Sequence, residues 1–561
     1  MKNKILILIC SLFVIAGSCT DDFNEINEQP NALSTEDVSA KFFVTNVQIG
    51  LFAPNRYPYW RGPIIHVDRY AGHTAFGFSA NWWSDGLGYD YSAGYTGAVY
   101  GWMSGYNSTL TAFANFVKEG GALENDQYYA ISLIMKGLYY QMYTDTFGMV
   151  PFAEASDPDI TTPKYDTQKD IYKGIIAGLD EAIGIIGSNT TTGSGTEILG
   201  ENDLFFKGDM QSWKKLANSL KLRLALRAHG APGEDFANAA ASESISGGVL
   251  GDLDALIERD TEISTWASAV YGDVWHSFYG GGHWNLAAAM VDVLRDNNDP
   301  RLYKYAVPSK GGTQTINKPV EGEQVALIDK HIAFLKEHFD SAGAEYTLTE
   351  TDESVTITMP ENTNYIGFPT RVNGRPKPYL HTDFFAKPAD IVVNRKNTGK
   401  PIFPWIVMSA GESHLMVAEA IVKGLATGDA ESHYKTGIRH AMKLWQVDDA
   451  DIDTYLATEN MGNLSGSKEE QLEKIALQRW LANFTNGFEG WAIVRDSGYP
   501  SKLYEGVSDP DLYALGTTLN GAYPQRMRYG GGAYNTNGDN LKAAISTQGE
   551  DVQGTKLWWA K

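Results

Sequence analysis

Apolar residues recur at three- and four-residue spacing along much of the chain, and this spacing predicts amphipathic helices. Residues 169–186 place six isoleucines and leucines on one stripe, and residues 209–229 place Trp213, Leu216, Leu220 and Leu224 on another. The same reading predicts further helices over residues 36–52, 126–145, 412–423, 431–445 and 468–484. The pattern therefore indicates a mainly α-helical protein.

Three stretches depart from this pattern. Residues 57–106 hold 14 aromatic residues and 9 glycines with few aliphatics, and glycine is costly inside a helix, so long structured loops are expected there. Residues 188–200 read as a Thr/Gly/Ser loop. Residues 346–359 alternate Thr with apolar residues, which predicts a strand or hairpin. Paired helices of this length suggest a tetratricopeptide-like stack with long loops and little β-structure, although no clean repeat consensus is readable.

The N-terminus has the pattern of a secretory signal. Basic residues 1–4 precede an apolar run over 5–16 and small residues before Cys19, and the run is too short to span a bilayer stably. The alternative is an N-terminal membrane anchor helix. The cleavage region resembles a bacterial lipobox, with Ala16 where Leu is usual. The resemblance implies a signal peptide over 1–18 and an acylated Cys19, whose two or three chains, at about 0.8 kcal/mol per buried CH₂, would hold the protein to the outer membrane.

Residues 19–36 are polar and read as a lipid-anchored tether, in which residues 20–23 resemble the acidic surface-export signal of Bacteroidetes lipoproteins. The net charge of −22 over 561 residues gives no support for nucleic-acid binding. The chain has 2 cysteines, Cys10 and Cys19, so the mature protein is expected to have no internal disulfide, thiolate metal site or thiol nucleophile.

Catalytic signatures are missing from the sequence. It contains no H-E-x-x-H, no G-x-S-x-G, no P-loop and no G-x-G-x-x-G, and its eleven His show no ligand spacing. We therefore expect no enzyme activity, no cofactor and no metal. A glycosidase pair of carboxylates stays open, because the separation of the two groups in space decides it.

Several blocks along the chain carry a family resemblance. They lie at residues 143–154, 171–186, 203–227, 412–420, 478–500, 524–529 and 557–559. In this order and spacing they resemble the SusD/RagB family of nutrient-binding lipoproteins, in its SusD-like variant, from Cys19 to the C-terminus. One departure is Asp496-Ser497, where the family commonly has Arg-Thr; it is expected to leave function untouched.

The resemblance implies a SusD-like fold over residues 37–561 as a single nutrient-binding domain. It also implies a SusC-like TonB-dependent β-barrel as partner, which the protein would cover like a lid. The recognisable blocks identify the scaffold rather than the ligand site. We expect Trp213, Asn218, Arg223 and Arg227 to be structural and His229 to cap the C-terminus of its helix.

A glycan site needs aromatic faces for C–H groups and polar side chains for hydroxyls. Two segments, 68–85 and 266–284, supply this mixture, and a later arginine is the type of residue that similar proteins add. The candidate ligand-binding residues are Asp68, His73, Asn81, Trp82, Trp83, Asp85, Trp275, Tyr279, His283, Trp284 and Arg371.

Three hypotheses follow from the sequence. The first is a cell-surface lipoprotein that captures an oligosaccharide and delivers it to the transporter. The second gives the same lid role to a protein that binds peptides or another nutrient. The third is a surface glycoside hydrolase.

Overall fold

The computed structural model describes residues 39–52, 56–76, 89–258, 284–319, 322–376, 379–392 and 403–561. Contacts divide the chain into two units, Met1–Ala40 and Lys41–Lys561, and the second holds every helix and strand described below. The predicted signal peptide, the tether and Cys19 lie outside the described residues. The boundary of a single domain at residue 37 stays a prediction.

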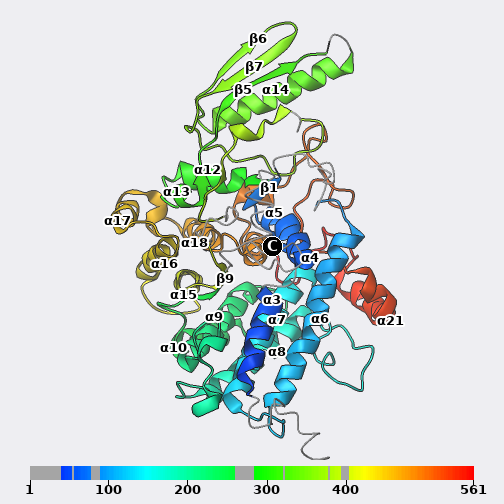
Figure 1. The fold of residues 1–561 in the computed structure, drawn as a ribbon, viewed down its shortest axis with the longest axis vertical. Coiled ribbons are helices and arrows are strands. Elements are labelled where there is room, and N and C mark those ends of the chain that lie inside the picture. The colour runs from blue at the N-terminus through cyan, green and yellow to red at the C-terminus, as the bar shows by residue number, and fades with distance from the viewer. Residues whose placement is uncertain are drawn as a thin grey trace, which may run out of the picture. The chain divides into compact units, whose positions relative to one another are not determined.

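Helices dominate the described chain (Figure 1). The longer ones are α3 (Lys41–Phe52), α6 (Ala93–Val117), α7 (Asp126–Phe147), α8 (Gln168–Ile186), α9 (Met210–Ala228), α10 (Ala237–Gly247), α12 (Ala288–Asp296), α14 (Glu323–Ser341), α15 (Ala410–Lys423), α16 (Ala430–Leu444), α17 (Asp449–Thr458), α18 (Lys468–Ala482), α19 (Gly487–Ser497) and α21 (Gly531–Gln548). Short turns of helix are α4 (Arg56–Tyr59), η1 (Trp60–Val67), α5 (Asp68–Tyr70), η2 (Gly195–Glu197), η3 (Gly200–Asn202), α13 (Leu302–Tyr305), η6 (Thr382–Phe384), η7 (Asn460–Gly462) and α20 (Ser501–Tyr504).

The predicted helices form within a few residues of their expected bounds because the sequence supplies their caps. Asn125 accepts hydrogen bonds from the backbone N–H groups of Gln127 and Tyr128 at the start of α7. Asp209 does the same for the first turn of α9. Ser467 and Glu470 form a capping box at the start of α18. The mainly helical fold is therefore confirmed.

The helices pack in consecutive pairs. Along the chain, α7 packs on α8, α8 on α9, and α9 on α10; later, α15 packs on α16 and α18. The contact of α15 with α16 brings backbones close, since a Cβ on Gly411 would lie 2.8 Å from the backbone nitrogen of Ala441. These helix pairs are the tetratricopeptide-like arrangement that the sequence predicts.

The β-structure within the described ranges consists of short pieces. Three strands form one antiparallel sheet in the order β5 (Gly312–Asn317), β7 (Ser354–Met359), β6 (Thr347–Glu350). Hence the hairpin predicted over residues 346–359 is confirmed. The remaining pairs are β1 (Thr74–Phe76) with β3 (Trp284–Leu286), β2 (Ala255–Ile257) with β9 (Trp405–Met408), and β4 (Ala306–Val307) with β8 (Lys387–Pro388).

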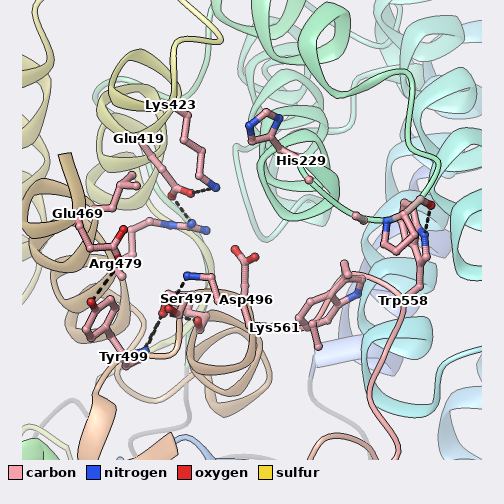
Figure 2. Close-up of a pocket in the computed structure, with 18 residues that line it drawn as sticks. His229, Glu419, Lys423, Glu469, Arg479, Asp496, Ser497, Tyr499, Trp558 and Lys561 are labelled. Atoms are coloured by element: carbon pink, nitrogen blue, oxygen red, sulfur yellow. Dashed lines mark hydrogen bonds and ion pairs between the residues drawn. The ribbon is translucent and has the colours of Figure 1, made fainter.

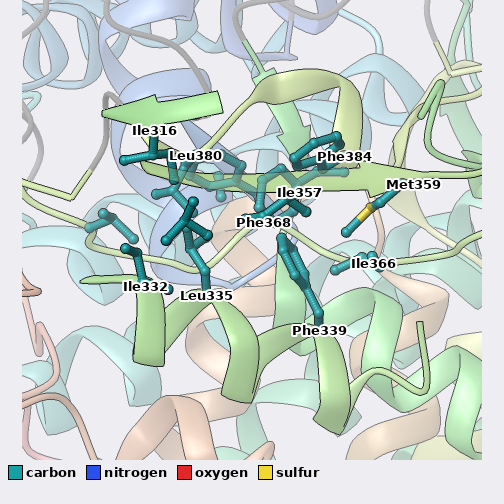
Figure 3. Close-up of a cluster of buried hydrophobic side chains, with 14 of the residues drawn as sticks. Ile316, Ile332, Leu335, Phe339, Ile357, Met359, Ile366, Phe368, Leu380 and Phe384 are labelled. Carbon is teal, nitrogen blue, oxygen red and sulfur yellow. The ribbon is translucent and has the colours of Figure 1, made fainter. Parts of the chain in front are cut away.

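The three-stranded sheet has a hydrophobic core of its own. Figure 3 shows Ile332, Leu335 and Phe339 of α14 pointing toward Ile316 and Ile357 of the strands. Further buried side chains from residues 359–385 complete this cluster, among them Met359, Ile366, Phe368, Leu380 and Phe384. The α14 helix thus covers one face of the sheet, while the threonines of β5 and β7 pair side by side on an exposed face.

The glycine-rich region differs from its prediction as loops. The chain is helical from Arg56 to Tyr70, through α4, the π-helix η1 and α5, and again from Ala93 in α6. Gly94, Gly97, Gly101 and Gly105 all lie inside α6, and a Cβ on each would meet nothing within 4 Å. The opposite side of α6 buries eight side chains, including Tyr100 and Phe113. Tertiary packing therefore outweighs the glycine cost, which is about 1 kcal/mol per residue.

A network of buried charges joins five helices. Arg223 of α9 donates to Glu412 of α15 at 2.6 Å, and Arg227 donates to Asp145 of α7 at 2.7 Å. Arg479 of α18 donates to Glu419 of α15 at 2.6 Å. The predicted structural role of Arg223 and Arg227 is therefore confirmed.

Glu489 of α19 lies at the centre of this network. It accepts from Arg227 and lies 3.6 Å from Arg223 Nε and 3.5 Å from Arg479 Nη2. Burial alone raises the pKa of a carboxyl, but the three guanidinium groups outweigh it and hold the pKa of Glu489 below its usual value. Asp145 is satisfied in the same way, with additional hydrogen bonds from Gln141, Tyr172 and Trp559.

Replacing Glu489 with Gln should destabilise the protein strongly. The substitution keeps the shape of the side chain but leaves three buried guanidinium groups with one fewer anion, a change that costs about 3–5 kcal/mol when a buried pair is broken. Urea unfolding followed by circular dichroism measures the loss. The matched control is Asp539→Asn, which breaks the exposed pair of Asp539 with Lys542 and should leave the unfolding midpoint unchanged. Equal midpoints for E489Q and the unmodified chain would contradict the role of the network.

Two helical glycines should respond in opposite ways to a single methyl group. Gly101→Ala adds a Cβ in open space and should raise the free energy of unfolding by about 0.5–1 kcal/mol through helix propensity. Gly411→Ala places its Cβ against the backbone of α16 and should lower it by about 1–3 kcal/mol. Thermal or urea unfolding of both variants is the measurement. A higher free energy of unfolding for G411A would show that α15 and α16 can pack stably without this close approach.

Candidate functional site

The two short strands β1 and β3 bring two predicted ligand-binding segments to one place. They pair antiparallel with the register Thr74 to Leu286, Ala75 to Asn285 and Phe76 to Trp284. The candidate segment 68–85 continues from Phe76, and the candidate segment 266–284 ends in Trp284. Both segments are thus anchored on one ladder, at paired positions.

The stretch that leads to Arg371, the later arginine of the prediction, joins the same ladder. The backbone N–H of Phe368 donates to Leu286 O at 2.8 Å, and the N–H of Ala288 donates to Phe368 O at 2.9 Å. Arg371 follows three residues later with φ of 60°, a strained value for a residue with a side chain. The structure therefore places Phe76, Trp284 and the stretch that leads to Arg371 on one ladder.

Arg371 acts as a clamp in this arrangement. Its guanidinium donates to four backbone carbonyls, those of Ala514, Leu515, Gly521 and Ala522, at 2.8–3.2 Å. It also lies 4.5 Å from the centre of the Tyr89 ring. Burial lowers the pKa of Arg371, and the carbonyl oxygens compensate for its lost hydration. The side chain ties residues 514–522 to the base of the site.

A second arginine, Arg69 of α5, also packs against the Tyr89 ring. The Arg69 guanidinium of α5 lies 5.0 Å from the Tyr89 ring and 5.9 Å from the Trp284 ring, while the Tyr89 hydroxyl donates to Arg69 O. Tyr70 packs edge-on against Tyr89 at 5.4 Å. Cation–π and aromatic contacts of this kind, buried from water, fix the positions of these rings beside the β1–β3 ladder.

Asp68 and His73 pack against α19. A Cβ on Gly487 would lie 2.2 Å from Asp68 Oδ1, and a Cβ on Gly490 would lie 2.6 Å from His73 Cε1, so the first turn of α19 requires glycine at both positions. His73 also contacts the rings of Trp480 and Phe484. Burial lowers the pKa of His73 to about 3, so the imidazole is neutral at physiological pH.

Four of the predicted ligand-binding residues are buried. Asp68, His73, Trp284 and Arg371 are exposed by 2%, 1%, 0% and 5%, so in this structure they present little surface to a ligand. Asp68 and His73 pack against α19, Arg371 packs against Tyr89 and residues 514–522, and the Trp284 ring lies beside Arg69. The other candidates, Asn81, Trp82, Trp83, Asp85, Trp275, Tyr279 and His283, lie outside the described residues and stay predictions.

A cavity of about 330 Å³, which the sequence did not reveal, lies at the other end of α19. Figure 2 shows Glu419 and Lys423 on one side, Trp558 on the other, and the Asp496 carboxylate projecting between them. His229, the predicted capping residue, follows the last residue of α9 and lines the cavity as well. The lining comes from five separated segments, which leaves no local sequence signal.

Other classes of site find no support within the described ranges. Among these residues, no three His, Cys, Asp or Glu side chains are placed to hold a metal ion. Of the helices that these residues form, none combines the length and apolar character that a membrane span requires.

Comparison with known proteins agrees with this architecture. Residues 30–530 match the family model SusD-like_2, described as "Starch-binding associating with outer membrane". Among curated proteins, no sequence matches this chain.

Solved structures share the fold at low sequence identity. A chitin-binding protein is 22% identical with a TM-score of 0.70, covering 93% of this chain and 100% of its own. A SusD-like protein from Bacteroides thetaiotaomicron is 22% identical with a TM-score of 0.67, covering 93% and 98%. A chitin-binding SusD homolog from Flavobacterium johnsoniae is 21% identical with a TM-score of 0.68, also covering 93% and 98%. The chain belongs to the SusD-like family.

Proposed function

We propose that this protein is a cell-surface lipoprotein that binds an oligosaccharide and delivers it to a SusC-like TonB-dependent transporter. The observation that carries the proposal is the ladder that pairs β1 with β3 and adds Phe368, which places the described ends of the two candidate segments beside the stretch that leads to Arg371. The family description as starch-binding and the names of two chitin-binding relatives support a glycan as the ligand class. Binding, rather than catalysis, is the proposed activity.

The chemistry of the two loops suits a glycan. Trp82, Trp83, Trp275 and Tyr279 supply ring faces for the C–H groups of a sugar, and Asn81, Asp85 and His283 supply hydrogen-bonding partners for its hydroxyls. The base of the site is fixed by Arg371, Arg69 and the paired strands. When the ends of both loops are held in place, the loops lose less conformational entropy as they bind a ligand, so the cost of binding is smaller.

The proposed location is the outer membrane, with the chain anchored through acylated Cys19 and exposed at the cell surface. The sequence carries the lipobox-like pattern, and the family is described as associating with the outer membrane. A tether over residues 19–36 would let the domain swing over the mouth of a partner barrel. The lid role and the barrel partner come from the family resemblance.

Ligand binding should depend on the two loops. We expect the soluble chain from residue 20 onward to bind one class of oligosaccharide in calorimetric titrations against malto-, xylo- and chito-oligosaccharides. Trp82→Ala and Trp275→Ala should each weaken binding about fivefold to tenfold through loss of a stacking ring. Tyr303→Ala is the matched control, because Tyr303 is an aromatic residue that is 66% exposed on α13.

The same titrations separate the alternatives. Binding only to a tryptic peptide digest would favour the peptide-binding lid. Release of reducing ends from a bound oligosaccharide would identify a hydrolase and overturn the binding proposal. Unchanged affinity in both tryptophan variants would remove these loops as the site.

Lipid anchoring should depend on Cys19. In the bacterium that produces the protein, the unmodified chain should partition into detergent and incorporate an alkyne fatty acid, and Cys19→Ala should do neither. Surface protease treatment of intact cells should degrade the anchored chain. A tagged chain should co-purify a SusC-like barrel from detergent-solubilised outer membranes. An acylated C19A variant, or purification of the tagged chain without any barrel, would contradict the anchor or the partner respectively.

A further inference from the structure

The cavity at the end of α19 is separate from the base of the loops. Gly487, at the start of α19, packs on Asp68, whereas Asp496 near its end lines the cavity. Asp496 comes nine residues after Gly487 along the helix, a rise of about 14 Å. The cavity therefore needs an explanation of its own.

Its charged lining residues are largely paired with one another. Lys423 Nζ lies 2.7 Å from Glu419 Oε1, and Arg479 Nη1 lies 2.6 Å from Glu419 Oε2. Burial raises the pKa of a carboxyl, but Lys423 and Arg479 outweigh it and lower the pKa of Glu419 to about 2. Lys423 and Arg479 are thus each paired with Glu419, which reduces what a charged ligand could gain from them, although Arg479 Nε has no hydrogen-bond partner among the described residues.

Two hydrogen-bonding groups in the wall have no such partners. Within the described part of the chain, the Asp496 carboxylate forms no hydrogen bond or ion pair, and Figure 2 shows it pointing into the cavity. The Nδ1 atom of His229 is buried there without a hydrogen-bond partner among the same residues. Polar atoms at a cavity wall that have no partner within the protein can accept hydrogen bonds from a ligand that brings its own donors.

The remaining wall is apolar and partly aromatic. The indole N–H of Trp558 donates to Pro232 O at 2.9 Å, so what is left of this half-buried ring is an apolar face. Leu472, Ala476 and Ile493 add aliphatic surface. An aromatic face beside free hydrogen-bond acceptors is the combination that recognises the C–H groups and hydroxyls of a sugar ring.

Charge selects among possible ligands. An anion would meet Asp496, and a cation would meet Lys423 and Arg479, whose charges are both close to the cavity. A neutral donor of hydrogen bonds meets neither obstacle. The volume of about 330 Å³ lies at the lower end of the range of about 300–1,000 Å³ found for ligand pockets, so the ligand must be small.

We propose that this cavity binds a small neutral polyhydroxylated ligand, one or two sugar rings in size. Asp496 accepts hydrogen bonds from its hydroxyls, and Trp558 packs against its C–H face. The choice of a sugar rests on the proposed glycan-binding function, to which the cavity adds a second and smaller site. The protein would then hold an oligosaccharide at its loops and a mono- or disaccharide at the end of α19.

Saturation-transfer NMR tests this on the soluble chain from residue 20 onward. Glucose, galactose, xylose and N-acetylglucosamine are titrated one at a time, and at least one should give a saturable signal. Asp496→Asn should weaken its binding about tenfold, since a hydrogen bond to a charged acceptor is lost. Trp558→Leu should weaken it to a similar degree. Asp539→Asn, an exposed carboxylate on α21, is the matched control and should bind as the unmodified chain does.

The variants keep the test decisive. Burial disfavours the charge of Asp496 and raises the pKa of that carboxyl, so Asn should leave the melting temperature unchanged or higher, and a loss of binding is then not a loss of folding. Trp558→Phe retains a ring against Tyr172 and should restore most of the affinity that Leu loses. Absence of any saturable sugar, or equal affinity in D496N and the unmodified chain, would overturn the proposal.

Failure here can be told apart from failure of the proposed function. Oligosaccharide binding that depends on Trp82 or Trp275, without monosaccharide binding that depends on Asp496, would leave the function intact and remove the cavity site. Monosaccharide binding that depends on Asp496, without any oligosaccharide binding at the loops, would retain the cavity site and remove the proposed capture role.

Discussion

The buried network around Glu489 is the constraint on which the helical scaffold depends. It joins α7, α9, α15, α18 and α19, and its arginines and carboxylates satisfy one another rather than water. Such charges cost several kcal/mol each to remove from water, and their attraction repays this only when the geometry is good. A set of paired ions therefore adds little net stability, but it permits few arrangements of the five helices. Its contribution here is to fix their register.

The α19 helix, which the network holds in place, contacts the ladder region at its start and the cavity at its end. Its first turn must approach Asp68 and His73 so closely that Gly487 and Gly490 are required. Glu489, between these two glycines, binds the arginines of α9 and α18. Asp496 then emerges near the last turn, at the cavity. The ladder that holds the loops and the wall of the cavity are consequently positioned by a single rigid element.

Much of the scaffold could be predicted because its signals are local. Stripes of isoleucine and leucine with capping residues such as Asn125 and Asp209 specified α7, α8 and α9 to within a few residues. The structural role of Arg223 and Arg227 was also accessible, since arginines beside a buried stripe need partners. The prediction of loops over residues 57–106 was wrong for α6, because glycine content reports the helix propensity of a segment and not the packing of its buried face.

The sites were harder to predict because they depend on contacts between distant segments. Residue types identified two segments and Arg371, whose described parts adjoin the β1–β3 ladder, but not that Trp284 and Arg371 would be buried there. The identity of an aromatic residue or an arginine does not show whether its side chain faces a ligand or packs inside the protein. Nothing in the sequence indicated the cavity. Asp496 lines it together with Lys423, His229 and Trp558, which lie between 62 and 267 residues away in sequence.

The balance of charge in the interior also bears on what the protein can bind. Lys423 and the network arginines Arg223, Arg227 and Arg479 are already held by carboxylates, so a charged ligand gains little from them and must break an existing pair to gain more. A neutral ligand with many hydroxyls needs only atoms that the fold leaves unsatisfied, such as the Asp496 carboxylate, together with ring faces to cover its apolar side. The pairing of these particular cations therefore favours uncharged polar ligands at the cavity, and it leaves discrimination among them to the side chains that line it.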